Sequence, residues 1–194
     1  MPLVTAGKLY HPGMMSTAFA MVGARAGDRV LVLGAPDPAS AALAAEIASV
    51  TGLNGRTLVV DVGDAARSRV EAAAAKAGAL VEFEWAPVTM LPLNLGEFDI
   101  AVINRQLGRH DGRNRIACCG EALRAVKPRG RVVVIEGQRR PGLFGLLPSR
   151  EPGLPAEGAR AALVAAGAIA ARQLAEADGV IYLEALSAGP SADT

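Results

Sequence analysis

Short apolar runs rich in β-branched residues alternate along the chain with longer, alanine-rich runs whose apolar positions recur at helical spacing. The short runs predict strands at residues 29–33, 57–62, 81–85, 98–103 and 131–136. Several of these runs are almost continuously apolar, which is typical of parallel strands covered on both faces. The longer runs predict helices at residues 38–50, 65–77 and 114–126. This alternation indicates right-handed βαβ units in a doubly wound sheet.

The end of the chain breaks this alternation. A helix is expected around residues 155–166, and two extended runs follow it, at residues 169–176 and 180–186. Ala177-Asp178-Gly179 separates them, and an Asp-Gly pair between strand-like runs favours a tight hairpin. The predicted fold is therefore α/β, a doubly wound Rossmann-like sheet of seven strands, five parallel followed by a C-terminal antiparallel hairpin.

Size and charge narrow the picture further. With 194 residues, 51% of them hydrophobic, the chain is expected to form a single domain across residues 1–194. Within it, residues 1–25 are expected to form a helical or irregular cap. The 20 basic and 19 acidic residues leave a net charge of +1. Such a balance gives no long-range field that would attract a polyanion, so no nucleic-acid partner is expected.

Cysteine and histidine usage bears on redox environment and metals. Cys118 and Cys119 are adjacent, which excludes a disulfide framework and favours a reducing compartment, so a cytoplasmic location is expected. Both fall on a predicted helix, where they are expected to be buried as small apolar side chains. The chain has two histidines and no metal-like spacing among Cys and His, so no metal site is expected.

A proline- and glycine-rich segment at residues 137–155 predicts a long irregular loop. Arginines flank an apolar stretch inside it. The candidate residues for contact with a protein partner or a membrane surface are Arg139, Arg140, Leu143 and Phe144. Three interpretations stay open. The loop is a lid over a substrate, a docking surface for a protein partner or a membrane, or a segment packed onto its own domain.

Three runs in the second half of the chain carry a family resemblance: residues 91–93 (LPL), 96–102 (GEFDIAV) and 122–134 (ALRAVKPRGRVVV). With the predicted topology, they resemble the class I S-adenosylmethionine-dependent methyltransferases, nearest to the quinone-biosynthesis type that acts on small molecules. The resemblance covers roughly residues 25–186. It implies a methyltransferase that binds S-adenosylmethionine and a small-molecule substrate.

The loop after the first strand departs from this family. Val32 stands where the family has an acidic residue, and Pro36 and Pro38 stand where it has its second and third glycines. Proline has no backbone N–H and a fixed φ, so this loop cannot reproduce a glycine turn. Asp37-Pro38 instead predicts the N-cap and first residue of the next helix. Asp37 is also a candidate to hold the ligand's ammonium group in place of the missing acid.

Other positions follow from the resemblance residue by residue. Asp61 ends the second strand, where the family has an acid that accepts both ribose hydroxyls; the alternative is a strand-end aspartate. Pro87 replaces the acid that contacts adenine, which leaves the backbone of Val88 for that edge. The full set of implied cofactor-binding residues is Gly34, Ala35, Asp37, Asp61, Val62, Val88 and Asn104.

His110 lies in a polar loop at residues 105–115, after the fourth strand, where ligands of doubly wound sheets bind. It is the candidate general base for a hydroxyl acceptor; the alternative is an exposed histidine in a solvated loop. The expected function is a small-molecule methyltransferase with a modified cofactor loop. The alternative function is a catalytically inactive protein of this fold that serves as a binding or assembly subunit through residues 139–147.

Overall fold

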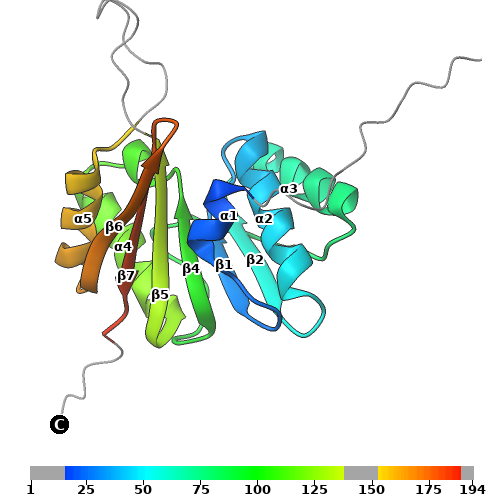
Figure 1. The fold of residues 1–194 in the computed structure, drawn as a ribbon, viewed down its shortest axis with the longest axis horizontal. Coiled ribbons are helices and arrows are strands. Elements are labelled where there is room, and N and C mark those ends of the chain that lie inside the picture. The colour runs from blue at the N-terminus through cyan, green and yellow to red at the C-terminus, as the bar shows by residue number, and fades with distance from the viewer. Residues whose placement is uncertain (1–15, 138–152, 189–194) are drawn as a thin grey trace, which may run out of the picture.

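A mixed seven-stranded sheet forms the centre of the structure, a computed structural model that describes residues 16–137 and 153–188 (Figure 1). The strand order is β3-β2-β1-β4-β5-β7-β6. The first five strands in the chain pair in parallel, and β7 pairs antiparallel with both β5 and β6. The strands are β1 (Arg29–Leu33), β2 (Arg56–Asp61), β3 (Glu82–Trp85), β4 (Phe98–Asn104), β5 (Val126–Gly137), β6 (Ile169–Ala177) and β7 (Val180–Leu186). The predicted fold class is confirmed.

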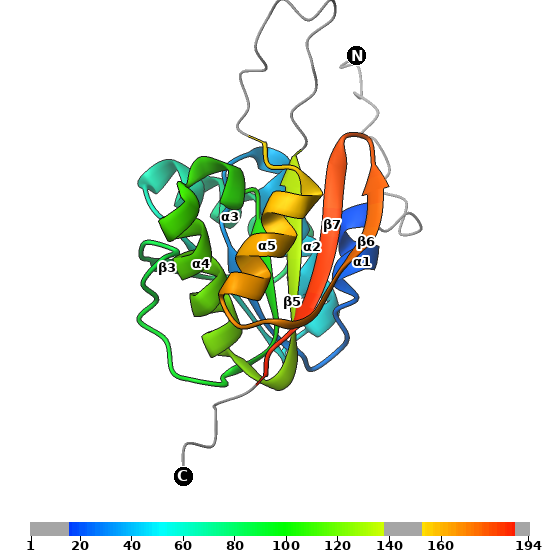
Figure 2. The same ribbon diagram turned by 90° about the vertical axis from the view of Figure 1, so that its left-hand side faces the viewer.

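Helices cover both faces of this sheet. They are α1 (Thr17–Val22), α2 (Pro38–Thr51), α3 (Asp64–Ala77), α4 (Gly112–Ala125) and α5 (Ala156–Ala165), with a short 3₁₀ helix, η1 (Leu107–Arg109). Buried side chains of α1, α2 and α3 share one core layer, and those of α4 and α5 share the other. Figure 2 shows α4 and α5 in front of the sheet, with α1 and α2 behind it.

Local sequence signals account for most of these boundaries. Asp37 caps α2, its Oδ1 accepting a hydrogen bond from the Ser40 N–H at 2.7 Å, and Pro38 is the first helical residue. Asp178 and Gly179 have φ angles of 53° and 75°, the consecutive left-handed residues that a tight hairpin turn requires. Cys118 and Cys119 are buried on α4, as predicted.

Two stretches differ from expectation. The polar loop predicted at residues 105–115 instead contains η1 and the first turn of α4, which Asp111 caps. Leu107 is fully buried there, and the Gly108 N–H donates to Oε2 of Glu136 at 3.2 Å, so an apolar contact and a hydrogen bond both hold the segment against the core. The other stretch is the start of β5, which begins at Val126, five residues before the predicted strand. Helix α1 lies within the expected helical or irregular cap, and its Phe19 and Val22 are buried.

The order in which strands are added to the sheet switches sides between β1 and β4. These strands are neighbours in parallel, with Leu33 beside Ile103 at their carboxyl ends, while β2 continues from the other edge of β1. Doubly wound sheets bind ligands outside the strand ends at such a switch point.

Residues Arg139, Arg140, Leu143 and Phe144 lie outside the described residues, so their predicted contact with a partner stays a prediction. Within the described part of the chain, no helix has the length and apolar character needed to cross a bilayer.

Candidate functional site

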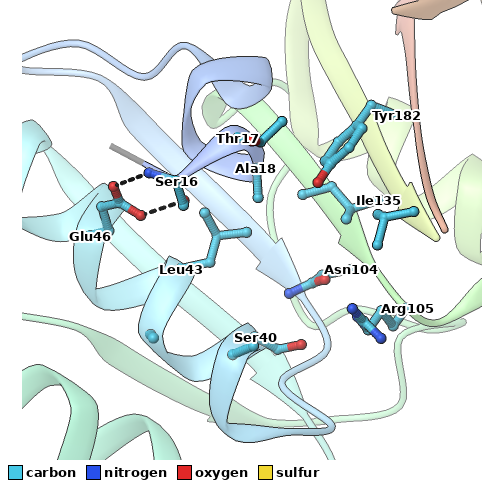
Figure 3. Close-up of a pocket in the computed structure, with 13 residues that line it drawn as sticks. Ser16, Thr17, Ala18, Ser40, Leu43, Glu46, Asn104, Arg105, Ile135 and Tyr182 are labelled. Carbon is cyan, nitrogen blue, oxygen red and sulfur yellow. Dashed lines mark hydrogen bonds between the residues drawn. The ribbon is translucent and has the colours of Figure 1, made fainter. Parts of the chain in front are cut away.

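A cavity of about 350 Å³ lies at the switch point, between α1, α2, the carboxyl ends of β4 and β5, and the start of β7 (Figure 3). We refer to it as the switch-point cavity. Its apolar lining consists of Ala18, Ala39, Ala42, Leu43, Ile135 and Val180. Its polar lining consists of Ser16, Thr17, Ser40, Glu46, Asn104, Arg105 and Tyr182.

Two buried polar side chains of this cavity are unsatisfied. Asn104 is the last residue of β4 and is 2% exposed, and Ser40, in the first turn of α2, is 3% exposed. Neither the Nδ2 atom of Asn104 nor the Oγ atom of Ser40 has a hydrogen-bond partner among residues 16–137 and 153–188. A buried polar group without a partner costs about 1–3 kcal/mol. Such groups in a cavity are typical of a site that a polar ligand completes.

Arg105 follows Asn104 in a left-handed backbone conformation, with φ at 54°. Its N–H donates to the carbonyl oxygen of Ile135 at 2.8 Å, which holds this residue, just after β4, against β5. Its Nε lies 3.6 Å from Oδ2 of Asp37. Left-handed non-glycine residues are strained and gather at functional sites, where the surrounding contacts maintain them. In this strained conformation Arg105 lines the cavity.

Two further side chains line the cavity, one from α2 and one from β7. The Glu46 carboxylate accepts hydrogen bonds from the N–H and the hydroxyl of Ser16, at 3.0 and 2.6 Å, and so joins the start of α1 to α2. Tyr182, on β7, is buried, and Figure 3 shows its hydroxyl oxygen pointing towards the other residues that line the cavity. Burial raises the pKa of the Tyr182 hydroxyl, so it stays protonated and can donate a hydrogen bond.

The loop after β1 is held by the chain itself. The Ala35 N–H donates to Oδ2 of Asp61 at 2.6 Å, and the Ala35 carbonyl oxygen accepts from Nη2 and Nε of Arg69 at 3.1 and 3.3 Å. The Gly34 N–H donates to the carbonyl oxygen of Val60. Since Pro36 and Pro38 have no N–H and the N–H groups of Gly34 and Ala35 are already used, this loop offers a ligand fewer donors than a glycine loop would.

Gln106 covers this loop from the β4 side. It is buried, and a Cβ atom placed on Gly34 would lie 2.0 Å from its Nε2 and 2.7 Å from the carbonyl oxygen of Asn104. Gly34, with φ at 97°, is therefore required both by its conformation and by this close approach.

The predicted cofactor residues do not all meet at one place. Gly34, Ala35, Asp37 and Asp61 meet around the loop after β1, and of the whole predicted set Asn104 lines the switch-point cavity. Val62, directly after β2, donates its N–H to Oδ1 of Asp61 at 2.7 Å, while its side chain is half-exposed. The side chain of Val88 lies apart, buried in the core layer shared with α4 and α5.

His110 directly follows η1 as its C-cap and is not among the residues that line the switch-point cavity. Its Nε2 atom is buried without a partner in the described part of the chain. Its role as a general base stays a prediction.

Several residues of the site were not singled out from the sequence: Ser40, Arg69, Gln106 and Tyr182. Each belongs to an ordinary helix, loop or strand pattern. The direction of each side chain depends on how the elements pack, and no local motif marks it.

Comparison with known proteins identifies the fold. No family model matches the sequence, and no curated protein matches it. A SAM-dependent methyltransferase from Aquifex aeolicus superposes with a TM-score of 0.72 at 16% identity, covering 88% of this chain and 87% of that one. One from Methanosarcina mazei has a TM-score of 0.62 at 16% identity, covering 90% and 99%.

A third similar structure is the [4+2]-cyclase SpnF, with a TM-score of 0.64, 16% identity and coverage of 88% and 78%. Since SpnF is a cyclase, the shared architecture does not by itself fix the reaction. The chain thus has the Rossmann-like fold of the class I SAM-dependent methyltransferases.

Proposed function

We propose that this protein is an S-adenosylmethionine-dependent methyltransferase that acts on a small molecule. The observation that carries the proposal is the pair of buried, unsatisfied groups of Asn104 and Ser40 in the switch-point cavity. They lie where doubly wound sheets bind ligands, in a chain whose structural neighbours are SAM-dependent methyltransferases. The closer resemblance to quinone-biosynthesis enzymes stays a prediction.

Asp61 fits the ribose of this cofactor. Its Oδ2 accepts from the Ala35 N–H and its Oδ1 from the Val62 N–H, at 2.6 and 2.7 Å. A carboxylate oxygen has two lone pairs, so each oxygen keeps one for the hydroxyls of a vicinal diol. At 8% exposure the carboxylate is nearly buried, which strengthens such hydrogen bonds.

The polar end of the cofactor has to be held differently from the glycine loop of the family. Because the loop after β1 has few donors left, we assign donation to Asn104 and Ser40, which reach the same switch point from β4 and α2. The bound cofactor supplies a methyl group activated by a positively charged sulfur. The chain's own contribution is to orient both ligands and to exclude water, and positioning alone can provide much of the rate enhancement.

Tyr182 and the α1 residues close the cavity on the side away from α2. His110 lies outside the cavity lining, so in this proposal methyl transfer depends on positioning, and a proton-accepting role of His110 is an addition to be tested by mutation.

Isothermal titration calorimetry with S-adenosylmethionine and S-adenosylhomocysteine tests the proposal. We expect saturable binding of both, and a loss of about tenfold or more in affinity for Asp61→Asn. Asp64→Asn is the matched control, because Asp64 is an exposed residue three positions away. Circular dichroism would establish that both variants fold. Absence of binding to the folded wild-type chain would reject the proposal and favour the assembly-subunit alternative.

A further inference from the structure

The charged groups that line the switch-point cavity do not balance. Arg105 is paired with Asp37, whose Oδ2 lies 3.6 Å from its Nε. Glu46 also lines the cavity, and its carboxylate has no basic partner in the described part of the chain. We propose that the outer end of this cavity binds a small organic amine, whose ammonium group lies against Glu46 and whose apolar body packs on Leu43. The assignment of this amine as the methyl acceptor rests on the proposed function, but the binding of the amine does not.

The Glu46 carboxylate is held in place by neutral donors. Its Oε1 accepts from the Ser16 N–H at 3.0 Å and its Oε2 from the Ser16 hydroxyl at 2.6 Å (Figure 3). Because both donors are uncharged, they orient the carboxylate without cancelling its negative charge. Each carboxylate oxygen has two lone pairs, so each keeps one for a further donor. Glu46 therefore suits a group that brings both a positive charge and N–H donors, as an ammonium does.

The other polar groups of the lining supply no compensating charge at this end. Tyr182 is neutral, because burial raises the pKa of its hydroxyl. The charge of Arg105 is opposed by that of Asp37, and Figure 3 shows Arg105 and Glu46 on opposite sides of the labelled residues. The two buried donors, which are assigned to the cofactor, are uncharged. One carboxylate is left in excess, so the outer end disfavours anions and favours a cation.

The surroundings of Glu46 set how the amine enters and how large it is. Ser16 and Thr17 are exposed, whereas Asn104 at the other end of the cavity is 2% exposed, so Glu46 lies nearer to solvent. Leu43 precedes Glu46 by three residues on α2 and supplies apolar surface beside it. A cavity of about 350 Å³ is at the small end of ligand pockets. The expected ligand class is a primary amine with one ring or a short branched chain.

As a methyl acceptor, the amine brings its own nucleophile. It first loses one proton to water at the exposed end of the cavity, because an ammonium nitrogen has no lone pair. The freed lone pair forms the N–C bond while the C–S bond breaks, and the electron pair of the C–S bond stays on sulfur. Positive charge thus passes from sulfur to nitrogen, and the products are a methylated ammonium and S-adenosylhomocysteine. Glu46 stabilises the charge that develops on the nitrogen beside it.

Benzylamine, which carries an ammonium group at neutral pH, is the probe. Benzyl alcohol and sodium benzoate are its neutral and anionic counterparts of similar shape. Chemical-shift titration of the isotope-labelled wild type gives the three affinities. We expect benzylamine to bind about fivefold more tightly than benzyl alcohol, and benzoate to bind most weakly. The preference for benzylamine should decrease with added salt. Equal affinities, or tighter binding of benzoate, would overturn the proposal.

Two variants separate the charge of Glu46 from its contact with Ser16. Glu46→Gln removes the charge and keeps the shape, so it should abolish the preference for benzylamine over benzyl alcohol. Ser16→Ala removes the hydroxyl that donates to Glu46 but leaves the carboxylate, so the preference should remain. Glu71→Gln removes an exposed carboxylate on α3, outside the cavity lining, and should change nothing. A preference unaltered in Glu46→Gln, or lost equally in Ser16→Ala, would overturn the proposal. The wild-type comparison stays decisive if a variant fails to fold.

The amino-acid end of S-adenosylmethionine also carries an ammonium group. If benzylamine and S-adenosylhomocysteine bind together, the amine site belongs to the acceptor. If S-adenosylhomocysteine displaces benzylamine, the assignment to the acceptor is rejected. 5′-Methylthioadenosine, which lacks the amino-acid end, then shows whether that ammonium group is responsible. Benzylamine binding without any S-adenosylhomocysteine binding would reject the proposed function and leave the amine site standing.

Discussion

The Asp61 carboxylate accepts a hydrogen bond from the backbone N–H of Ala35 at 2.6 Å, which ties the end of β2 to the loop after β1. Arg69 holds Ala35 from the other side, because its Nη2 donates to the Ala35 carbonyl oxygen. With prolines on both sides of Asp37, this loop is maintained by side chains of neighbouring elements and has few free N–H groups. At the switch point, the buried groups left without a partner among the described residues include Oγ of Ser40 and Nδ2 of Asn104.

Replacing Asp61 by asparagine should destabilise the fold by about 2 kcal/mol. Both oxygens of Asp61 face backbone N–H groups, those of Ala35 and Val62. An amide keeps one acceptor and turns its NH₂ group towards a second donor, so one charge-assisted bond is lost and one N–H is left unpaired. Urea denaturation followed by circular dichroism measures the difference.

The control for this substitution is Asp64→Asn. Asp64 is exposed at the start of α3, where its charge interacts with the helix dipole and with the nearby Arg67, so its loss should cost about 0.3–1 kcal/mol. Equal effects of the two substitutions would mean that the Asp61 contacts do not hold the loop.

Two glycines with nearly the same φ angle allow the conformational cost of adding a Cβ to be measured separately from its steric cost. Gly34 and Gly63 have φ at 97° and 95°, but a Cβ on Gly34 meets Gln106 at 2.0 Å, whereas a Cβ on Gly63 meets nothing within 4 Å. Gly63→Ala should carry only the conformational cost, about 1–3 kcal/mol. Gly34→Ala should lose about 1–3 kcal/mol more through overpacking, as thermal unfolding would show.

Adding Gln106→Ala to Gly34→Ala should restore part of this loss, because the closest atom is then removed. Restoration should be incomplete, since the backbone oxygen of Asn104 still lies 2.7 Å from the new Cβ. Equal losses for Gly34→Ala and Gly63→Ala would show that both the Gln106 side chain and the Asn104 backbone yield to the new Cβ, and would contradict this crowding.

The elements of this fold were predictable because their signals are local. Asp37-Pro38 starts a helix through one cap and one fixed φ, and Asp178-Gly179 closes a hairpin through two residues that tolerate left-handed angles. The bounds of helix α1 within the expected N-terminal cap were not predicted, because six residues are too few to display a helical period.

The site was less predictable because its contacts join elements that are distant in the sequence. Asp61 was singled out for a ribose, yet its contact with Ala35 follows only from the adjacency of β1 and β2. Tyr182 enters the cavity because β7 lies beside β5, and Ser40 because α2 turns that face towards β4. Neither residue belongs to a motif that a single sequence displays.

The two cysteines should be inert in the folded protein. Burial raises the pKa of Cys119 to about 12, and burial together with the charges of Cys119, Glu136 and Glu121 raises that of Cys118 further. Since the thiolate is the reactive form, a disulfide reagent at about pH 8 should label neither thiol promptly. Both should react once the chain is unfolded in denaturant. Prompt labelling of one thiol in the native state would contradict this burial.

Glu136 should give the fold an unusual pH dependence. It is 1% exposed at the end of β5, its Oε2 accepts from the Gly108 N–H at 3.2 Å, and its Oε1 has no partner in the described part of the chain. Burial raises the pKa of this carboxyl above its ordinary value of 4.5, despite the backbone hydrogen bonds. The folded state therefore binds a proton more tightly than the unfolded state.

The sign of the effect follows from this difference. As the pH falls from neutrality towards 4.5, Glu136 takes up its proton in the folded state first, so the wild type should gain stability relative to Glu136→Gln. Glu184 is the opposing control. Burial would raise its pKa, but hydrogen bonds from Arg131 and Arg172 lower it overall. The wild type should therefore lose stability relative to Glu184→Gln only as the pH falls below 4.5. Urea midpoints across this range measure both differences, and parallel curves for the two variants would show that Glu136 is not desolvated.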